Sequence, residues 1–105
     1  MTLAQVRKFA LSLQHASEEP HFDRTSFRVG KKIFATAKPS DSHLNVFVPE
    51  EVREPALAMH PEWLSKLLWG GKVVGLTVDL PQAEPGVVRD LLTSAWESRA
   101  PKSRS

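Results

Sequence analysis

The feature that most restricts the fold is a pair of short strand-like runs separated by only two residues, Gly30 and Lys31. The flanking runs, "TSFRV" and "KIFATA", are rich in β-branched and aromatic residues, the types that favour strands. A glycine in a two-residue connection is typical of a tight hairpin turn, because glycine readily adopts positive φ angles. Residues 25–37 are therefore predicted to form an antiparallel hairpin.

Two later runs alternate between apolar and other side chains. In "HLNVFV", residues 43–48, the leucine and the two valines share one face of a strand, whereas Asn45 and Phe47 lie on the other face. The run "VVGLTVDL", residues 73–80, alternates in the same way and predicts a strand with one buried face. Between them, "WLSKLLW" at residues 63–69 is apolar without a clear period, so both a strand and a helix stay open for it.

Three helices are predicted around these strands. A Thr-x-x-Gln capping box precedes the first one, at about residues 3–14. Pro49 suits the first turn of a second helix, and Pro61 ends its pattern. An apolar stripe predicts the last helix over residues 85–98. The run "HASEEPHFDR" at residues 15–24 has no period and contains a proline, so we expect a loop there.

The order helix, three strands, helix, one or two strands, helix predicts an α+β domain of two layers. Its antiparallel sheet has four to five strands, and its three helices lie on the apolar sheet face. Residues 1–100 are expected to form a single domain, and residues 101–105 a flexible tail with too few apolar side chains to pack. The alternating and helical apolar positions predict one shared core that contains Phe27, Val29, Leu44, Val46, Leu76, Val78, Leu91 and Trp96.

Several classes of protein are excluded or disfavoured by composition. The chain has no cysteine, which excludes disulfides, thiolate nucleophiles and cysteine-bound zinc. A polar loop explains the neighbouring Glu19, His21 and Asp23, so we expect no metal and no cofactor. The apolar patch after Arg7 and Lys8 is too short for a signal peptide, and no segment approaches a membrane span. A cytoplasmic location is expected, as a monomer or weak homodimer without membrane contact.

The basic residues are concentrated in the predicted hairpin. The formal net charge is only +2, but residues 24–38 contain five lysines and arginines and no acidic residue. By contrast, residues 50–62 contain four glutamates and a single arginine. The chain therefore has a basic region and an acidic region, and this distribution matters more for partners than the net charge does.

The run "EEPHFDRTSFRVGKKIFATA" resembles the N-terminal signature of the MmcQ/YjbR family. The later runs "VPEEV", "GLTVDL" and "LLTSAWESRAPK" also fit this family in their order and spacing. The resemblance implies a small cytoplasmic α+β domain whose antiparallel sheet is flanked by helices, an arrangement likened to a double-wing DNA-binding motif. It brings no catalytic residues.

Carried over by position, the resemblance implies that the hairpin around Gly30 and Lys31 is one wing. The turn around Gly70, Gly71 and Lys72 is the candidate for the second wing. The chain departs from the family at "WLSKLLWGGKVV", which is more apolar than the basic, aromatic loop often found there. Whether the segment from Trp63 to Val74 forms a second wing is therefore open.

The resemblance and the basic run together predict a non-enzymatic DNA-binding protein. Lysine and arginine side chains neutralise phosphates and release counterions when DNA binds. The residues predicted to contact DNA are Arg24, Arg28, Lys31, Lys32, Lys38 and Lys72. A plainer role for the same charges is to keep an edge hairpin soluble and to prevent edge-to-edge pairing.

Two other functions stay open. A partner protein is an alternative to DNA, bound by an exposed sheet face with Phe47 or by the acidic middle helix set against the basic hairpin. An enzyme acting on a small molecule needs an activated nucleophile, an oriented base and an oxyanion hole. Ser26 and Ser42 have His21 and His43 nearby in the sequence, but no nucleophile-elbow or related motif surrounds them.

Overall fold

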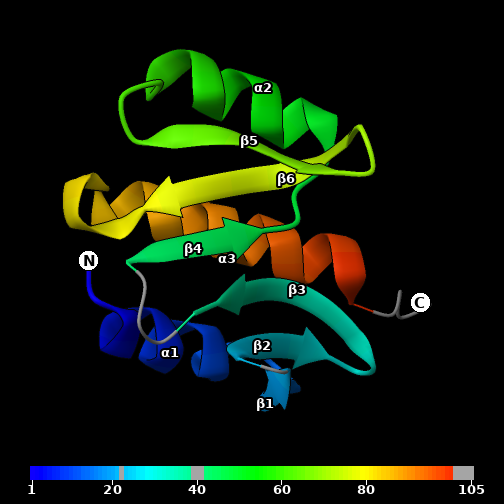
Figure 1. The fold of residues 1–105 in the computed structure, drawn as a ribbon. Coiled ribbons are helices and arrows are strands. Elements are labelled where there is room, and N and C mark those ends of the chain that lie inside the picture. Colours follow the sequence, from blue (N-terminus) through cyan, green and yellow to red (C-terminus); the bar gives the residue numbers. More distant parts are fainter. Residues whose placement is uncertain (22, 39–41, 101–105) are drawn as a thin grey trace.

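A computed structural model describes residues 1–21, 23–38 and 42–100 and shows one antiparallel sheet backed by helices (Figure 1). In chain order the elements are α1 (Leu3–Ser12), β1 (Ala16–His21), β2 (Arg24–Val29), β3 (Lys32–Ala37), β4 (His43–Val46), α2 (Glu50–Met59), β5 (Leu64–Trp69), β6 (Lys72–Asp79), the short 3-10 helix η1 (Leu80–Gln82) and α3 (Pro85–Arg99). The six strands lie in the order β1-β2-β3-β4-β6-β5. Helix α3 runs behind the middle of the sheet, with α1 and α2 on its two sides (Figure 1), so the predicted two-layer α+β fold is confirmed.

The predicted loop over residues 15–24 is wrong, because Ala16–His21 form β1. This strand pairs with β2 along its whole length, from Ala16 opposite Val29 to His21 opposite Arg24. It is an edge strand, where Pro20 is tolerated because only one side of the strand must donate to the sheet. With β1 and β5 included, the sheet has six strands instead of the predicted four to five.

A partly buried polar contact holds β1 against its neighbours. The Glu18 carboxylate accepts hydrogen bonds from Arg7 Nε of α1 and from the Thr25 hydroxyl of β2, each at 2.7 Å. The Arg7 guanidinium is the main cause that keeps the pKa of Glu18 below its ordinary value of 4.5, and the Thr25 hydroxyl acts in the same direction. Glu18 therefore links α1, β1 and β2 while it is ionised.

These contacts predict a pH dependence of stability. Because the pKa of Glu18 is lowered in the folded state, its contribution is fully present above pH 4.5 and is lost as the pH falls through the lowered folded-state pKa. We expect Glu18→Gln to reduce the free energy of unfolding near neutral pH. The free energy of unfolding should also fall less steeply as the pH is lowered, as measured by urea denaturation across the pH range. Glu19→Gln, at the exposed neighbouring position, is the control and should behave like the wild type. If the free energy of unfolding of Glu18→Gln falls in acid as steeply as that of the wild type, the Arg7–Glu18 contact contributes nothing to stability.

The core lies between the sheet and the helices. Seven of the eight predicted core residues are buried in it, and the exception is Trp96, which is half-buried and packs against the core from its rim. The reason is that α3 turns Leu92 and Ala95 toward the core, while the Trp96 indole Nε1 donates to the Gln14 carbonyl at 2.9 Å. Trp96 therefore joins α3 to the α1–β1 connection.

The remaining predictions concern boundaries and segments left open. The apolar run at residues 63–69 forms β5, and a bulge between Leu67 and Leu68 explains why it shows no simple alternation. The strand predicted over residues 43–48 ends at Val46. No helix of the described residues is both long and apolar enough to cross a membrane. The predicted flexible tail, residues 101–105, lies outside the described residues.

Candidate functional site

The sheet face turned away from the core carries a row of polar side chains. Strand pairing places each of them directly opposite the next one, in the order Ser26, Thr36, Asn45, Thr77 and Ser65. The Thr77 hydroxyl donates to Asn45 Oδ1 at 2.9 Å, and Asn45 Nδ2 makes a longer contact of 3.4 Å with Thr36 Oγ1. Strand alternation places this row on the sheet face opposite the buried apolar positions. Ser26 and Thr36 are themselves buried, Asn45 and Thr77 are partly exposed, and Ser65 is exposed.

Two hairpin turns lie at the same end of this sheet, on the right in Figure 1. The β2–β3 turn contains Gly30 at φ 63°, and the β5–β6 turn contains Gly70 and Gly71 at φ 57° and 83°. Residues with a Cβ atom rarely adopt such angles, which explains glycine at these positions. The predicted tight turn at Gly30 is confirmed. The segment left open from Trp63 to Val74 supplies β5, the second turn and the start of β6, which form a second hairpin.

A hollow of about 300 Å³ opens beside these turns. Residues from four parts of the chain line this turn-end hollow: Arg28, Lys31, Lys32, Ile33, Phe47, Trp69 and Arg99. The β2–β3 hairpin supplies three of the cations, and the last turn of α3 supplies Arg99. Two aromatic side chains and four cations therefore meet in one concave surface.

Phe47 organises the aromatic part of the turn-end hollow. Its side chain is only 3% exposed although it is separate from the main core, in contrast to the exposed sheet face that the alternation suggested for it. The Trp69 ring lies edge-on to it at a centroid distance of 5.0 Å, and the Arg99 guanidinium carbon lies 5.5 Å from its ring centre. Phe47 thus supports both Trp69 and Arg99 from below, through aromatic and cation–π contacts.

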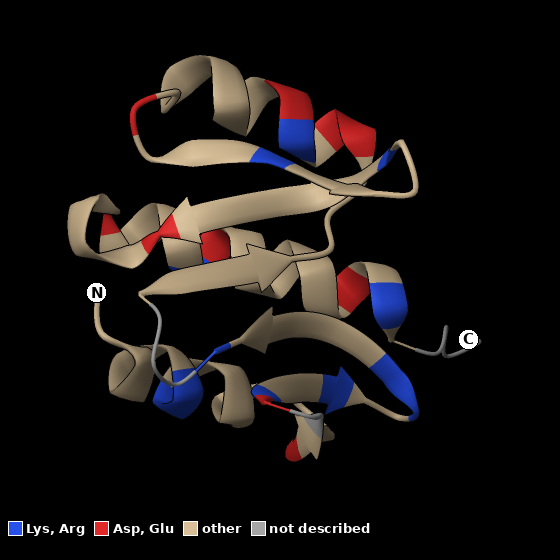
Figure 2. Ribbon diagram, in the orientation of Figure 1, with Lys and Arg blue, Asp and Glu red and all other residues tan. Residues whose placement is uncertain are grey.

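The cations around the turn-end hollow lack ion-pair partners among the residues that the structure describes. Arg28 Nε donates to the Ser26 hydroxyl at 3.0 Å, a neutral partner. Within residues 1–21, 23–38 and 42–100, no acidic side chain forms an ion pair with Arg28, Lys31, Lys32 or Arg99. Figure 2 shows these blue segments of the β2–β3 hairpin and of the α3 end near one another. The hollow therefore has an unpaired positive charge that favours an anionic ligand.

The six predicted contact residues lie in four different places in the structure. Arg28, Lys31 and Lys32 line the turn-end hollow, and Lys72 is exposed at the start of β6, beside the second turn. Lys38 instead forms an ion pair of 3.3 Å with Asp23, a contact that holds the pKa of Asp23 below its ordinary value.

Arg24 belongs to a second hollow on the same sheet face, also of about 300 Å³. Its lining is less basic than that of the turn-end hollow, because Asp23 is part of it. Thr36 and Asn45 of the polar row form another part of the wall, and Trp69 lines both hollows. We call this the polar-row hollow. Trp69 thus stands between a cationic site and a site with amide and hydroxyl groups.

Sequence reasoning missed Arg99 and Trp69 as site residues. Nothing local marks Arg99, because its relation to Phe47 depends on how α3 packs across the sheet. Trp69 had a usable signal, since it directly precedes the Gly70-Gly71 turn, a position where a side chain tends to be exposed. Its side chain is 57% exposed.

Comparison with known proteins identifies the fold and the family. The model of the YjbR family matches residues 11–98. The chain belongs to the YjbR family. A crystal structure of the Deinococcus radiodurans protein DR2400, with the domain DUF419, superimposes with a TM-score of 0.83 over 99% of this chain and 82% of that one. The two sequences are 21% identical, so this likeness shows the fold alone. No curated protein matches the chain.

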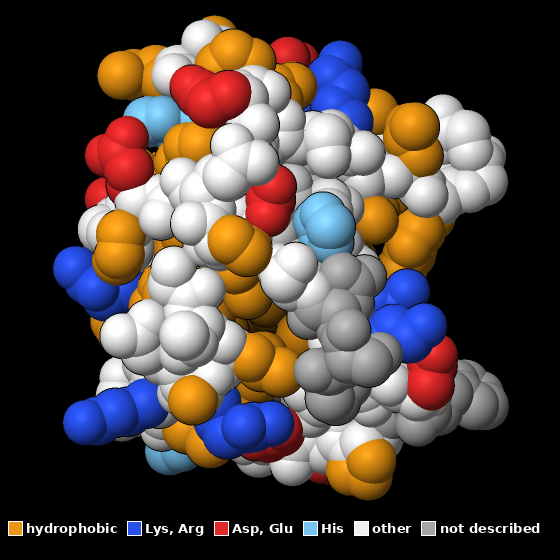
Figure 3. All heavy atoms as spheres, turned by 60° about the vertical axis from the view of Figure 1, so that its left-hand side comes forward, with side chains coloured by type: hydrophobic (Ala, Val, Ile, Leu, Met, Phe, Trp, Pro, Cys, Tyr) orange, Lys and Arg blue, Asp and Glu red, His pale blue; other side chains and the backbone are white. Residues whose placement is uncertain are grey.

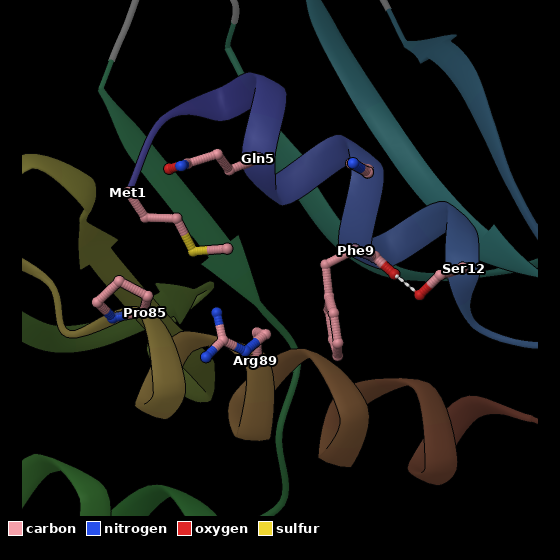
Figure 4. A pocket seen from close by; sticks show the side chains of 7 residues that line it. Met1, Gln5, Phe9, Ser12, Pro85 and Arg89 are labelled. Carbon is pink, nitrogen blue, oxygen red and sulfur yellow. Dashed lines mark hydrogen bonds between the residues drawn. The ribbon is translucent and has the colours of Figure 1, made fainter.

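The YjbR domain has another hollow, of about 420 Å³, between α1 and the start of α3 (Figure 4). It is lined by Met1, Gln5, Lys8, Phe9, Ser12, Pro85 and Arg89. The Ser12 hydroxyl donates to the Phe9 carbonyl at 2.6 Å, and among the described residues no histidine or carboxylate lines this hollow to act as a base. The residues present do not form the acid–base pair that hydrolytic chemistry needs.

The end of the sheet away from the turns has a mixed surface. Figure 3 brings this side forward, and hydrophobic, acidic and basic side chains are intermingled on it. Among the described residues, no group of three or more histidine, aspartate or glutamate side chains is placed to hold a metal ion. The turn-end hollow, together with the polar-row hollow, is therefore the best candidate site of this YjbR domain.

Proposed function

We propose that this YjbR domain is a non-enzymatic DNA-binding protein that holds the phosphate backbone at the turn-end hollow. The observation that carries the proposal is the convergence of Arg28, Lys31, Lys32 and Arg99 on one hollow without acidic partners among the described residues. Such cations exchange condensed counterions for direct phosphate contacts, which is the main source of affinity for DNA. The concave shape concentrates their field.

The distribution of acidic residues indicates where the backbone runs. Glu50, Glu51 and Glu54 lie in the first half of α2, next to the edge strand β5. The β2–β3 hairpin lies toward the opposite edge of the sheet (Figure 2). Phosphates approaching that side are repelled. We therefore place the DNA backbone on the β2–β3 hairpin and the end of α3, with Lys72 at the margin of the contact.

A titration of labelled DNA at two salt concentrations tests this function. Four phosphate contacts predict that log Kd changes with log salt with a slope of about 3 to 4, so that binding weakens roughly 100-fold between about 50 and 200 mM salt. Fluorescence anisotropy measures this directly. A chain with no affinity at the lower salt concentration, or with an affinity independent of salt, would contradict the proposal.

A partner protein is the second candidate. It is favoured by β5, an edge strand of the sheet on which the side chains of Leu68 and Trp69 are both 57% exposed. An exposed edge strand accepts another strand by backbone hydrogen bonding. Self-association that increases with concentration and is lost in Leu68→Lys would support this role. The absence of a cofactor, the cytoplasmic location and the monomeric or weakly dimeric state stay predictions.

A further inference from the structure

We propose that the DNA held at this site is an unpaired strand, with one base stacked on the Trp69 indole and its neighbouring phosphates against the cations of the turn-end hollow. The inference rests on the proposed function and adds the structural state of the ligand. It is drawn from three features: the packing of Trp69 on Phe47, the position of Trp69 between the two hollows, and the polar groups of the polar-row hollow.

The position and packing of Trp69 are suited to stacking with a base. Trp69 is the last residue of β5, is held opposite Lys72 by strand pairing, and is 57% exposed. Its ring is supported edge-on by the buried Phe47 at 5.0 Å. A ring held in this way loses little freedom when a base stacks on it, and a tryptophan exposed on a surface costs hydrophobic free energy unless a ligand covers it.

The cations stand where the phosphates of a stacked nucleotide need them. Trp69 shares the turn-end hollow with Arg28, Lys31 and Arg99. Binding surfaces for single strands combine a basic groove along the backbone with aromatic rings on which bases stack. The same combination is present here within one hollow of about 300 Å³.

The polar-row hollow contains hydrogen-bonding groups for the edge of the stacked base. Asn45 and Thr36 line it together with Trp69. Asn45 Oδ1 is oriented by the Thr77 hydroxyl at 2.9 Å, whereas the contact of Asn45 Nδ2 among the described residues is a longer one of 3.4 Å to Thr36 Oγ1. A carboxamide carries both a donor and an acceptor, as does the Watson–Crick edge of a base. We place this edge at Asn45.

A duplex does not satisfy this geometry. In a duplex both faces of each base are covered by neighbouring base pairs, and the edges used for pairing are occupied. Phosphates alone would bind the cations equally well in either state, so the basic residues do not discriminate. Trp69 and Asn45 discriminate, because both act on surfaces that only an unpaired, unstacked base exposes.

The test compares a fluorescein-labelled single strand of about 12 nucleotides with the same strand annealed to its complement. We expect tighter binding of the single strand, accompanied by quenching of tryptophan fluorescence. Trp69→Ala should weaken single-strand binding by roughly 5- to 100-fold and weaken duplex binding by a much smaller factor. Trp69→Phe, which keeps an aromatic face, should restore most of the affinity. Leu68→Ala is the matched control, because Leu68 is equally exposed on the same strand, and it should bind like the wild type.

The outcomes separate this inference from the proposed function. Equal or tighter binding of the duplex, or single-strand binding that is unchanged in Trp69→Ala, would overturn the inference and leave the DNA-binding function in place. A lack of binding to both probes at low salt would overturn the function itself. An RNA strand of the same sequence forms the third arm, and a clear preference for it would overturn the assignment to DNA. Thermal melting of each variant establishes that it is folded.

Discussion

Gly75→Ala is expected to destabilise the domain by more than about 3 kcal/mol, a large part of the stability of a chain of this size. A Cβ atom at residue 75 would lie 2.0 Å from the Val46 carbonyl oxygen, 3.0 Å from its carbon and 3.1 Å from Phe47 Cα. All three are backbone atoms, which cannot move aside by changing a rotamer. Relief requires that the end of β4 separates from β6 in the middle of the sheet.

The same substitution should also disturb the candidate site. Gly75 lies against the backbone of Phe47, and Phe47 supports Trp69 and Arg99. We therefore expect any folded Gly75→Ala protein to bind DNA more weakly than the wild type. Urea denaturation measures the stability, and anisotropy measures the binding of the fraction that remains folded.

Gly86→Ala is the control for this prediction. Gly86 lies in the first turn of α3, and a Cβ atom there would meet only the end of the Arg89 side chain, at 4.0 Å. Without a clash or a positive φ, alanine reduces the freedom of the unfolded chain and should stabilise the fold by about 0.4–1 kcal/mol. A Gly75→Ala protein with the denaturation midpoint of the wild type would contradict the close approach of β4 to β6.

The double substitution Lys31→Glu with Lys32→Glu should abolish DNA binding. Both side chains are exposed and line the turn-end hollow, so the change replaces two phosphate contacts by two repulsive charges. Any residual binding should have a salt slope smaller by about two units. Substitutions of exposed charges usually change stability by less than about 0.5 kcal/mol, so unfolding should not account for the loss.

A matched control separates position from net charge. Lys8 and Arg89 are exposed on the wall of the hollow between α1 and α3, and Lys8→Glu with Arg89→Glu changes the net charge by the same amount. We expect this variant to keep most of the affinity. If both double variants lose binding equally, the protein's overall charge governs the interaction, and if the Lys31/Lys32 variant binds like the wild type, these lysines only keep the hairpin soluble.

Part of the site could be read from the sequence because it is local. The Gly30-Lys31 turn fixes the β2–β3 hairpin, and strand alternation around it turns Arg28 away from the core, as the structure confirms. Both hydrogen bonds of the predicted capping box at the start of α1 are present. Each of these depends on backbone dihedrals and on side-chain periods over a few neighbouring residues, which the amino-acid types in that stretch determine.

The other part was decided only by the tertiary structure. Phe47, Trp69 and Arg99 are far apart in the chain and meet because β5 pairs beyond β6 and α3 crosses the sheet. The strand β1 has no alternation of its own and is ordered by pairing with β2 and by the hydrogen bonds of Glu18. Such contacts stabilise the fold only after distant segments have been brought together, so a local sequence pattern does not predict them. The basic hairpin is therefore a property of the sequence, whereas the aromatic platform beside it exists only in the assembled sheet.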